Sequence, residues 1–177
     1  MRTEGTTPAA AGSRAQQMLD VVCFQVAGCE YCVDVDSVLG VNPLIDVRPV
    51  PGVPSFVRGV VDIRGRVIPI LGLRERLGAE PAEDDIERRI VVVRTKSGMA
   101  GMVVDAVTRI WQTHADDVSE PPAGLGAPDC VSGVARMGDE IVLMLDLDVV
   151  VDTDLAGPLG TGSQIFGEMN SGGEDGN

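Results

Sequence analysis

Hydrophobic residues recur at every second position in many short runs, and turn-forming residues separate these runs. Residues 20–27 and 31–35 show the pattern on either side of Gly28-Cys29-Glu30. A two-residue period between turn residues predicts β-hairpins. Further strands are predicted at residues 41–50 (irregular), 89–95, 99–105, 107–112, 130–135 and 140–145. Short helices are predicted at residues 36–39, with Asp36 as N-cap, and at residues 73–77 and 147–155.

The stretch from Phe56 to Leu77 has the most informative pattern. Two apolar runs, residues 59–63 and 67–71, flank Arg64-Gly65-Arg66, and three residues centred on glycine predict a hairpin. Asp62 and Arg64 lie two positions apart, so on an extended strand they face the same side. We therefore expect a carboxylate and a guanidinium together at the hairpin tip, beside a glycine that leaves room for a partner backbone. The alternative is two solvated charges at an ordinary turn.

The two halves of the chain resemble each other. Residues 35–41 match residues 104–110, and Gly59-Val60 matches Gly133-Val134. Each copy would form a strand-rich unit of roughly 65 residues, which is too small to bury much surface alone. Short, regularly spaced strands favour small barrels over a parallel α/β sheet. The sequence therefore predicts one all-β domain of two packed barrels, with the seam between them as a natural partner site.

The predicted domain spans residues 18–155, with the acidic, proline-containing segment 79–87 as its internal linker. Residues 1–17 and the acidic, glycine-rich residues 156–177 show no period, so we expect a disordered leader and a disordered tail. Within that tail, Ile165-Phe166 is a weaker candidate for a short docking motif.

Composition limits the classes of partner. The net charge of −13 and a pI near 4.3 argue against nucleic acid and anionic membrane surfaces. No apolar run approaches the roughly 20 residues of a spanning helix, and the N-terminus lacks an apolar signal-peptide core. We expect a cytoplasmic protein without direct membrane insertion, whose four cysteines are reduced thiols.

The sequence offers little for catalysis. It contains no P-loop, no G-x-G-x-x-G before a helix and no paired-carboxylate motif, and His114 is expected at the surface. Cys29 and Cys32 form a C-x-x-C, but a zinc site would need two more ligands and a redox pair a helix N-terminus. Cys23 and Cys32 are therefore expected in the core. We predict no enzymatic activity, no metal and no cofactor.

A binding module is the remaining class. Arg64 is the strongest candidate contact, because its planar guanidinium suits recognition of carboxylates and carbonyls at interfaces. Val38, Val57 and Val41 are the candidates to line a groove near it. Each could instead belong to the core, and for Val41 the core is favoured.

At this point the residues resemble a known family, the CheW-like domain of bacterial chemotaxis coupling proteins. The resemblance rests on Phe24, Glu30-Tyr31, Val33-Asp34-Val35, the run from Pro54-Ser55-Phe56 to Asp62-Ile63-Arg64-Gly65, Val67-Ile68-Pro69-Ile70, Val103-Val104-Asp105 and Ile141 to Asp146. It implies two five-stranded SH3-like barrels and no catalysis. It also implies an adaptor that binds the cytoplasmic hairpin tip of chemoreceptors and the regulatory domain of a CheA-type histidine kinase. Rings with other CheW-like domains would hold it at membrane receptor arrays.

The resemblance assigns roles to individual positions. Arg64 matches the arginine of the family's Asn-Leu-Arg-Gly motif, Val38 a valine on the receptor-facing side, and Arg58 a basic position before Gly-Val. Two positions depart from the family. Asp62 stands where the family usually has Asn, and Gly40 stands where it often has Glu. The predicted partner-binding set is Arg64, Val38, Arg58, Asp62, Gly65, Val57 and Gly40.

Other functions stay open from the sequence. One is a CheW-like scaffold of a non-flagellar chemosensory pathway, and another is a scaffold that binds other CheW-like domains but no receptor. The third is a thiol-redox or metal-binding protein that uses Cys29 and Cys32.

Overall fold

The computed structural model describes residues 17–152. The predicted tail with Ile165-Phe166, and all of the predicted leader except Gln17, lie outside these residues. The strands are β1 (Met18–Val26), β2 (Cys29–Asp34), β3 (Val38–Pro43), β4 (Val57–Ile63), β5 (Arg66–Gly72), β6 (Arg89–Thr95), β7 (Gly98–Val104), β8 (Ala106–His114), β9 (Val118–Ser119), β10 (Val131–Met137) and β11 (Glu140–Leu145). The helices are α1 (Leu73–Arg76) and α2 (Leu147–Val151), with 3-10 turns η1 (Val35–Ser37) and η2 (Ala115–Asp117).

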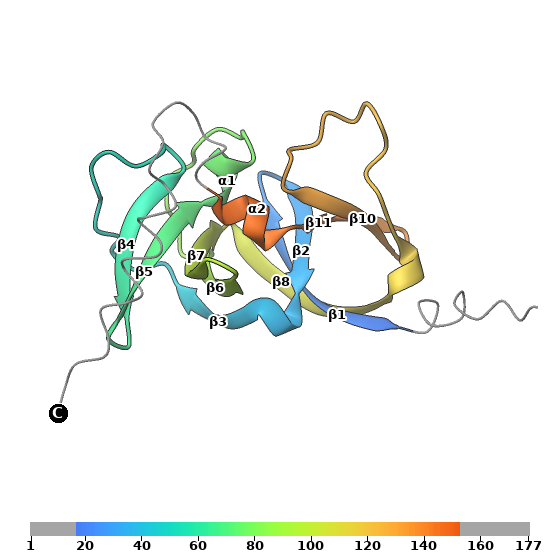
Figure 1. The fold of residues 1–177 in the computed structure, drawn as a ribbon, viewed down its shortest axis with the longest axis horizontal. Coiled ribbons are helices and arrows are strands. Elements are labelled where there is room, and N and C mark those ends of the chain that lie inside the picture. Colours follow the sequence, from blue (N-terminus) through green and yellow to red (C-terminus); the bar gives the residue numbers. More distant parts are fainter. Residues whose placement is uncertain (1–16, 153–177) are drawn as a thin grey trace, which may run out of the picture.

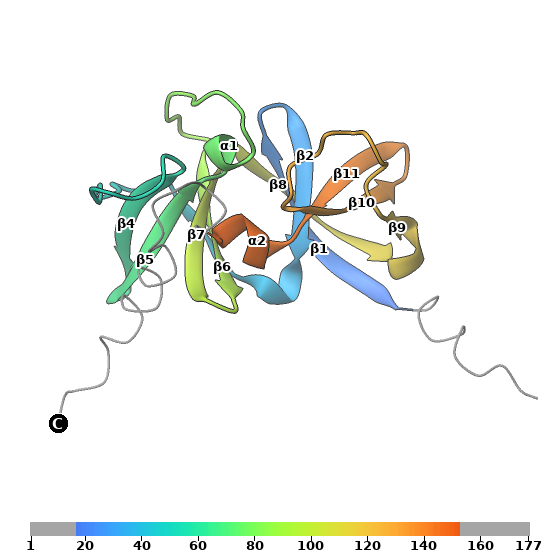
Figure 2. The ribbon, with the colours of Figure 1, turned by 45° about the horizontal axis from the view of Figure 1, so that its top comes forward.

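The strands form two sheets, as the all-β prediction requires. Sheet A has the order β8-β1-β2-β11-β10-β9, and sheet B has the order β3-β6-β7-β5-β4. Sheet B lies on the left of Figure 1 and sheet A on the right, with α2 between them in both views (Figures 1 and 2). Each sheet contains one parallel pair, β2 with β11 and β5 with β7, in otherwise antiparallel pairing. The two sheets are thus built alike, which explains the repeat.

The barrels do not follow the predicted halves of the sequence. Sheet B takes the contiguous strands β3 to β7, whereas sheet A combines β1 and β2 with β8 to β11. Segment 79–87 connects α1 to β6 inside the sheet-B barrel, so it does not divide one barrel from the other. The chain crosses between sheets at η1 and at Asp105, which are the two matching Val-Asp-x-Val steps of the repeat. The β1–β2 hairpin needs β8 and β11 as neighbours to bury its apolar faces.

The core consists of three hydrophobic clusters, of which only the central one joins the two sheets. Ile90 and Val92 lie on one face of sheet B with Ile68 and Ile70, whereas Val91, on the opposite face, joins the central cluster. That central cluster lies between the sheets and receives Leu147, Val150 and Val151 from α2. A third cluster on the other face of sheet A contains Val21, Cys23, Cys32, Ala135, Met137 and Val142. Because strands such as β6 are covered on both faces, their sequences are continuously apolar.

Two hairpins close with tighter turns than predicted. Arg64 and Gly65, at φ 55° and 80°, form a two-residue turn between β4 and β5, and both positive φ values identify type I′. The turn between β1 and β2 has the same form at Ala27 and Gly28, at φ 51° and 81°. Arg64 therefore lies outside the strand, and the expected alignment with Asp62 is wrong. Instead, Asp62 Oδ1 accepts a hydrogen bond of 2.7 Å from the Gly65 amide.

Two further local predictions are corrected. The N-cap of η1 is Asp34 rather than Asp36, since Asp34 Oδ1 accepts a 2.8 Å hydrogen bond from the Asp36 amide. The predicted strand at 41–50 ends at Pro43, and beyond it only Arg48 bridges to Val60. A proline cannot donate to the next ladder bond, which favours the early end.

Candidate partner-binding surface

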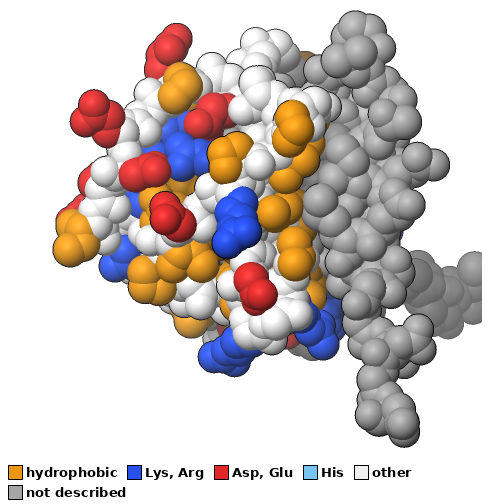
Figure 3. Space-filling view, turned by 90° about the vertical axis from the view of Figure 1, so that its left-hand side faces the viewer, with side chains coloured by type: hydrophobic (Ala, Val, Ile, Leu, Met, Phe, Trp, Pro, Cys, Tyr) orange, Lys and Arg blue, Asp and Glu red, His pale blue; other side chains and the backbone are white. Residues whose placement is uncertain are grey.

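A pocket of about 310 Å³ opens on sheet B. It is lined by Leu39, Gly40, Val41, Asn42, Ile63, Arg64, Arg66, Ile68, Val92 and Met99. We call it the sheet-B pocket. Ile68 and Val92 are buried and form its apolar floor, whereas Leu39 and Val41 are exposed at its rim. Figure 3 views the β4–β5 side of the molecule and shows hydrophobic side chains in a band, with both basic and acidic side chains beside it.

Two arginines give this pocket a positive edge in an acidic protein. Within residues 17–152 the Arg64 side chain makes no ion pair or hydrogen bond, and Arg66 Nη1 contacts only the Met99 sulfur, at 3.8 Å. Most other arginines are engaged inside the fold. Arg58, for example, pairs with Asp84 at 2.9 Å and with Glu75 at 3.4 Å. The pocket therefore offers unpaired guanidinium groups to a partner.

Gly40 leaves the sheet-B pocket open, although its backbone conformation does not require glycine. Its φ lies outside the positive range, and a Cβ built there would meet only the Asn42 side-chain nitrogen, at 3.8 Å. By contrast, a Cβ at Gly59 would lie 2.0 Å from the Arg48 carbonyl oxygen. The fold thus needs glycine at position 59 but not at position 40, where its effect is to leave space in the pocket that Arg64 also lines.

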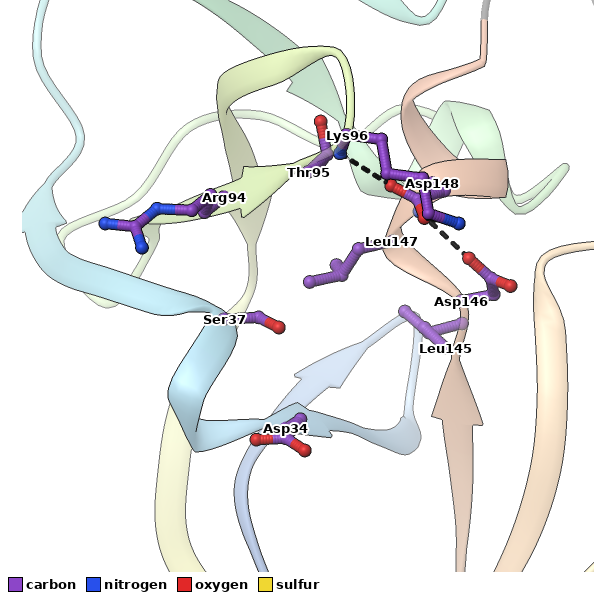
Figure 4. A pocket seen from close by; sticks show the side chains of 9 residues that line it. All are labelled: Asp34, Ser37, Arg94, Thr95, Lys96, Leu145, Asp146, Leu147 and Asp148. Atoms are coloured by element: carbon purple, nitrogen blue, oxygen red, sulfur yellow. Dashed lines mark hydrogen bonds and ion pairs between the residues drawn. The ribbon is translucent and has the colours of Figure 1, made fainter.

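A second pocket, of about 430 Å³, lies between the two barrels. It is lined by Asp34, Ser37, Arg94, Thr95, Lys96, Leu145, Asp146, Leu147 and Asp148, which come from η1 and its cap, β6 and the start of α2 (Figure 4). Its leucines are buried among charged side chains. Lys96 closes one side, since its amide and its ammonium bind the two carboxylate oxygens of Asp148 at 2.8 and 2.9 Å. We call it the interbarrel pocket.

The η1–β3 segment connects the two pockets. Ser37 lines the interbarrel pocket, and residues 39–42 line the sheet-B pocket. Val38, between them, is half-buried against the central cluster. β3 is also an edge strand of sheet B, so its unpaired backbone groups are available to a partner.

The structure brings together only part of the predicted site. Arg64 and Gly40 line one pocket, with Gly65 and Asp62 forming the adjoining turn. Val57 is half-buried and packs against the central cluster.

Arg58 belongs to a separate ion-pair cluster, in which its guanidinium lowers the pKa of the Asp84 carboxyl. Val41, expected in the core, is 44% exposed. The seam between the barrels was expected as a partner site, but the residues that line the interbarrel pocket, and Arg66, were not named, because the pattern of one strand does not show which distant loops meet.

The cysteines do not form the pair suggested by the C-x-x-C motif. Cys29 and Cys32 are three positions apart on β2 and therefore point to opposite faces, with Cys29 exposed and Cys32 buried. Cys23 and Cys32 are buried in the sheet-A cluster, as predicted. Among the described residues, no group of three or more His, Cys, Asp or Glu side chains is arranged to hold a metal ion.

A family model described as the CheW-like domain matches residues 20–154. The chain belongs to the CheW-like domain family. This family consists of non-catalytic scaffold and adaptor proteins, so the chain is a chemotaxis coupling adaptor rather than an enzyme. Among residues 17–152 the CheW-like domain has no helix of sufficient length and hydrophobicity to cross a membrane.

Individual relatives agree with this assignment. The chemotaxis protein CheW of Rhizobium meliloti (strain 1021) is 29% identical over 137 residues, which cover 76% of this chain and 88% of the relative. Protein FrzA of Myxococcus xanthus is 34% identical over 115 residues, or 65% of this chain and 71% of FrzA. The crystal structure of the scaffolding protein TtCheW from Thermoanaerobacter tengcongensis superposes with a TM-score of 0.73 at 25% identity, covering 77% and 94% of the two chains. The predicted two-barrel fold is confirmed.

Proposed function

We propose that this adaptor couples the cytoplasmic tips of chemoreceptors to a CheA-type histidine kinase, in the cytoplasm at membrane receptor arrays. The observation that supports the proposal best is the surface formed by η1, β3 and the β4–β5 turn. It joins a pocket between the barrels to a pocket with two unpaired arginines, and it includes an edge strand. Such a surface suits a protein partner rather than a small substrate.

In this proposal the receptor tip lies along η1 and β3. Arg64 and Arg66 bind carboxylates of the receptor, and apolar receptor side chains cover Leu39 and Val41. Charge complementarity favours an acidic receptor segment here, because the two guanidinium groups have no carboxylate partner within the described residues. The open space at Gly40 allows the receptor backbone to approach Arg64 closely.

The mechanism is positional. Side chains from both barrels line the interbarrel pocket. A receptor bound there therefore contacts both barrels and affects the orientation of their outer surfaces toward the kinase. The adaptor would hold the kinase regulatory domain at a fixed place beside the receptor tip. Movement of the receptor then changes the kinase geometry without any chemical step in the adaptor.

Hydrogen–deuterium exchange tests this assignment. The full chain is measured alone, with a receptor cytoplasmic fragment, and with the kinase regulatory domain from the same organism. We expect the receptor fragment to protect amides of residues 37–42 and 62–66. Binding of the receptor with protection confined to sheet A would contradict the proposed surface. Failure to bind either partner would contradict the coupling function itself.

A further inference from the structure

The sheet-A barrel contains two thiols that face each other, Cys23 on β1 and Cys32 on β2. They are register partners in the β1–β2 hairpin, and both are fully buried in the same hydrophobic cluster. The adaptor function uses neither residue. Cys29, the other cysteine of the C-x-x-C motif, is exposed and points away from this pair.

The hairpin register determines how close these thiols lie. In a two-residue hairpin the pair that closes the turn, here Val26 with Cys29, is hydrogen-bonded, and the pair types alternate along the strands. Cys23 with Cys32 is the third pair beyond it and is therefore of the non-hydrogen-bonded type. In such pairs the Cα atoms lie about 4.5 Å apart and the side chains are at their closest. Disulfides span Cα distances of about 4.4–6.8 Å, so the hairpin backbone already permits the bond.

The two thiols differ in their surroundings. Burial raises the pKa of both, that of Cys32 to about 12. Arg109, the β8 register partner of Cys23, counteracts this effect by lowering the pKa of Cys23. The Arg109 side chain is 33% exposed and pairs with Glu30 and Glu140, two carboxylates that themselves raise the pKa of Cys23. Of the two thiols, Cys23 is the one with a guanidinium as its cross-strand neighbour, and we assign the first reaction to it.

We propose that Cys23 and Cys32 are an oxidative modification site, at which hydrogen peroxide converts the pair into a cross-strand disulfide inside the sheet-A barrel. The Cys23 thiol loses its proton, its thiolate attacks one oxygen of hydrogen peroxide, and the O–O bond breaks to leave Cys23 as a sulfenic acid; the departing hydroxide takes up the thiol proton and leaves as one water. The Cys32 sulfur then attacks the Cys23 sulfur. The S–S bond forms, the S–O bond breaks, and the hydroxide leaves with the Cys32 proton as a second water. Two thiols and one peroxide thereby yield one disulfide and two waters.

The bond would brace the segment that leads to the partner surface. Cys32 lies two residues before Asp34, the N-cap of η1, and β3 follows directly. A disulfide between residues 23 and 32 closes a short loop and restricts the unfolded chain. Because both thiols are buried, oxidation is slower than at exposed Cys29, so the bond forms during sustained oxidant exposure.

Oxidation of the full-length Cys29→Ser chain with hydrogen peroxide tests the proposal. This background removes the exposed thiol that would link separate molecules. After native oxidation, the remaining thiols are alkylated in denaturant, and a protease that cleaves after Glu30 separates Cys23 from Cys32. We expect a disulfide-linked fragment pair that separates on reduction, a Tm higher by roughly 5–10 °C, and an unmodified Cys130.

Two controls make the outcome decisive. Oxidised Cys23→Ser/Cys29→Ser protein should give no linked fragments and no gain in Tm. In the wild-type chain, Cys29 should be oxidised first, and the Cys23–Cys32 link should appear later. The proposal is wrong if Cys23 and Cys32 stay free after Cys29 is fully oxidised. It is equally wrong if Cys29 with Cys32 is the pair that forms, or if the link appears only in denaturant.

Discussion

Arg64 occupies a backbone conformation that arginine rarely adopts. It lies at the first central position of a type I′ turn, with φ 55°, where Asn, Asp and Gly are preferred. A left-handed conformation costs a residue with a Cβ on the order of 1 kcal/mol. No hydrogen bond or ion pair of the Arg64 side chain offsets this strain within the described residues. A strained, unpaired arginine at a pocket is what a binding residue would show.

Because the Arg64 backbone is strained, substitution of this residue can separate its effect on stability from its effect on binding. Arg64→Asn creates the favoured Asn-Gly turn, so the free energy of unfolding should rise by about 0.5–1 kcal/mol. Ala27→Asn makes the same change in the β1–β2 turn, which has matching φ values, and serves as the control. Both variants should unfold at higher urea concentration than the wild type. Destabilisation by Arg64→Asn alone would show that the arginine is structural.

Gly40 gives a second prediction at this scale. Gly40→Glu should leave the free energy of unfolding within about 0.5 kcal/mol of wild type, because a side chain there meets only an ordinary contact. Its carboxylate would enter the sheet-B pocket, which Gly40 and Arg64 both line, and would repel an acidic partner, so receptor binding should weaken roughly tenfold or more. Ala123→Glu adds the same charge to an exposed loop and should bind normally. Titration calorimetry measures the affinities, and equal affinity of Gly40→Glu and wild type would contradict the role of the pocket.

At the scale of elements, most strands and hairpins could be predicted from the sequence. The strand at 89–95 was predicted with its observed bounds, since an apolar run between charged residues and Lys96-Ser97 marks both ends. The sequence could not show that the β1–β2 hairpin joins the late strands, because pairing between distant strands leaves no local pattern. The same limit explains why Arg58 was placed beside Arg64. Arg58 lies near the start of β4 and Arg64 directly follows its end, but an ion pair with Asp84, from a distant loop, holds the Arg58 side chain in a separate cluster.

The contact between α1 and α2 is testable at this scale. Arg76 Nε donates to the Val150 carbonyl at 2.9 Å and Nη2 donates to the Val149 carbonyl at 2.7 Å, with the guanidinium 5.4 Å from the Phe56 ring centre. Arg76→Ala leaves the last carbonyls of α2 without these donors, so it should cost about 1–3 kcal/mol of unfolding free energy. Arg136→Ala, at an exposed strand position, is the control. Equal urea midpoints of the two variants would show that the contact contributes nothing.

At the scale of the whole molecule, an ion-pair cluster joins the barrels. Asp105, at a crossover between the sheets, accepts hydrogen bonds from Arg74 at 2.9 Å and from the Ala27 amide at 2.8 Å. It also lies 3.5 Å from Arg88, which is buried and pairs with Asp84 at 2.8 Å. This cluster connects the first hairpin, α1 and the acidic segment, so the barrels form one body.

The cluster predicts a sensitivity to acid. Burial raises the pKa of Asp105, but its bonds to Arg74 and Ala27 outweigh burial, and the pKa is lower than in an unfolded chain. Its stabilising contribution is therefore complete above the unfolded pKa, near 4, and is lost as the pH falls through the folded pKa. Urea unfolding from pH 6 to pH 2.5 should show this loss, and Asp105→Asn should reduce it. Asp116→Asn, a substitution at an exposed position, is the control and should show the same loss as the wild type. A loss in Asp105→Asn equal to that of the wild type would contradict this account.

The most direct measurement is co-sedimentation of the adaptor with a receptor cytoplasmic fragment and the chemosensory kinase of the same organism. Wild type, Arg64→Asn and the turn control Ala27→Asn are compared. The account predicts a ternary complex with wild type and with Ala27→Asn. It predicts that Arg64→Asn, although at least as stable, loses the receptor from the pellet. Assembly of the full complex by Arg64→Asn would contradict the central claim that the β3 and β4–β5 surface binds the receptor.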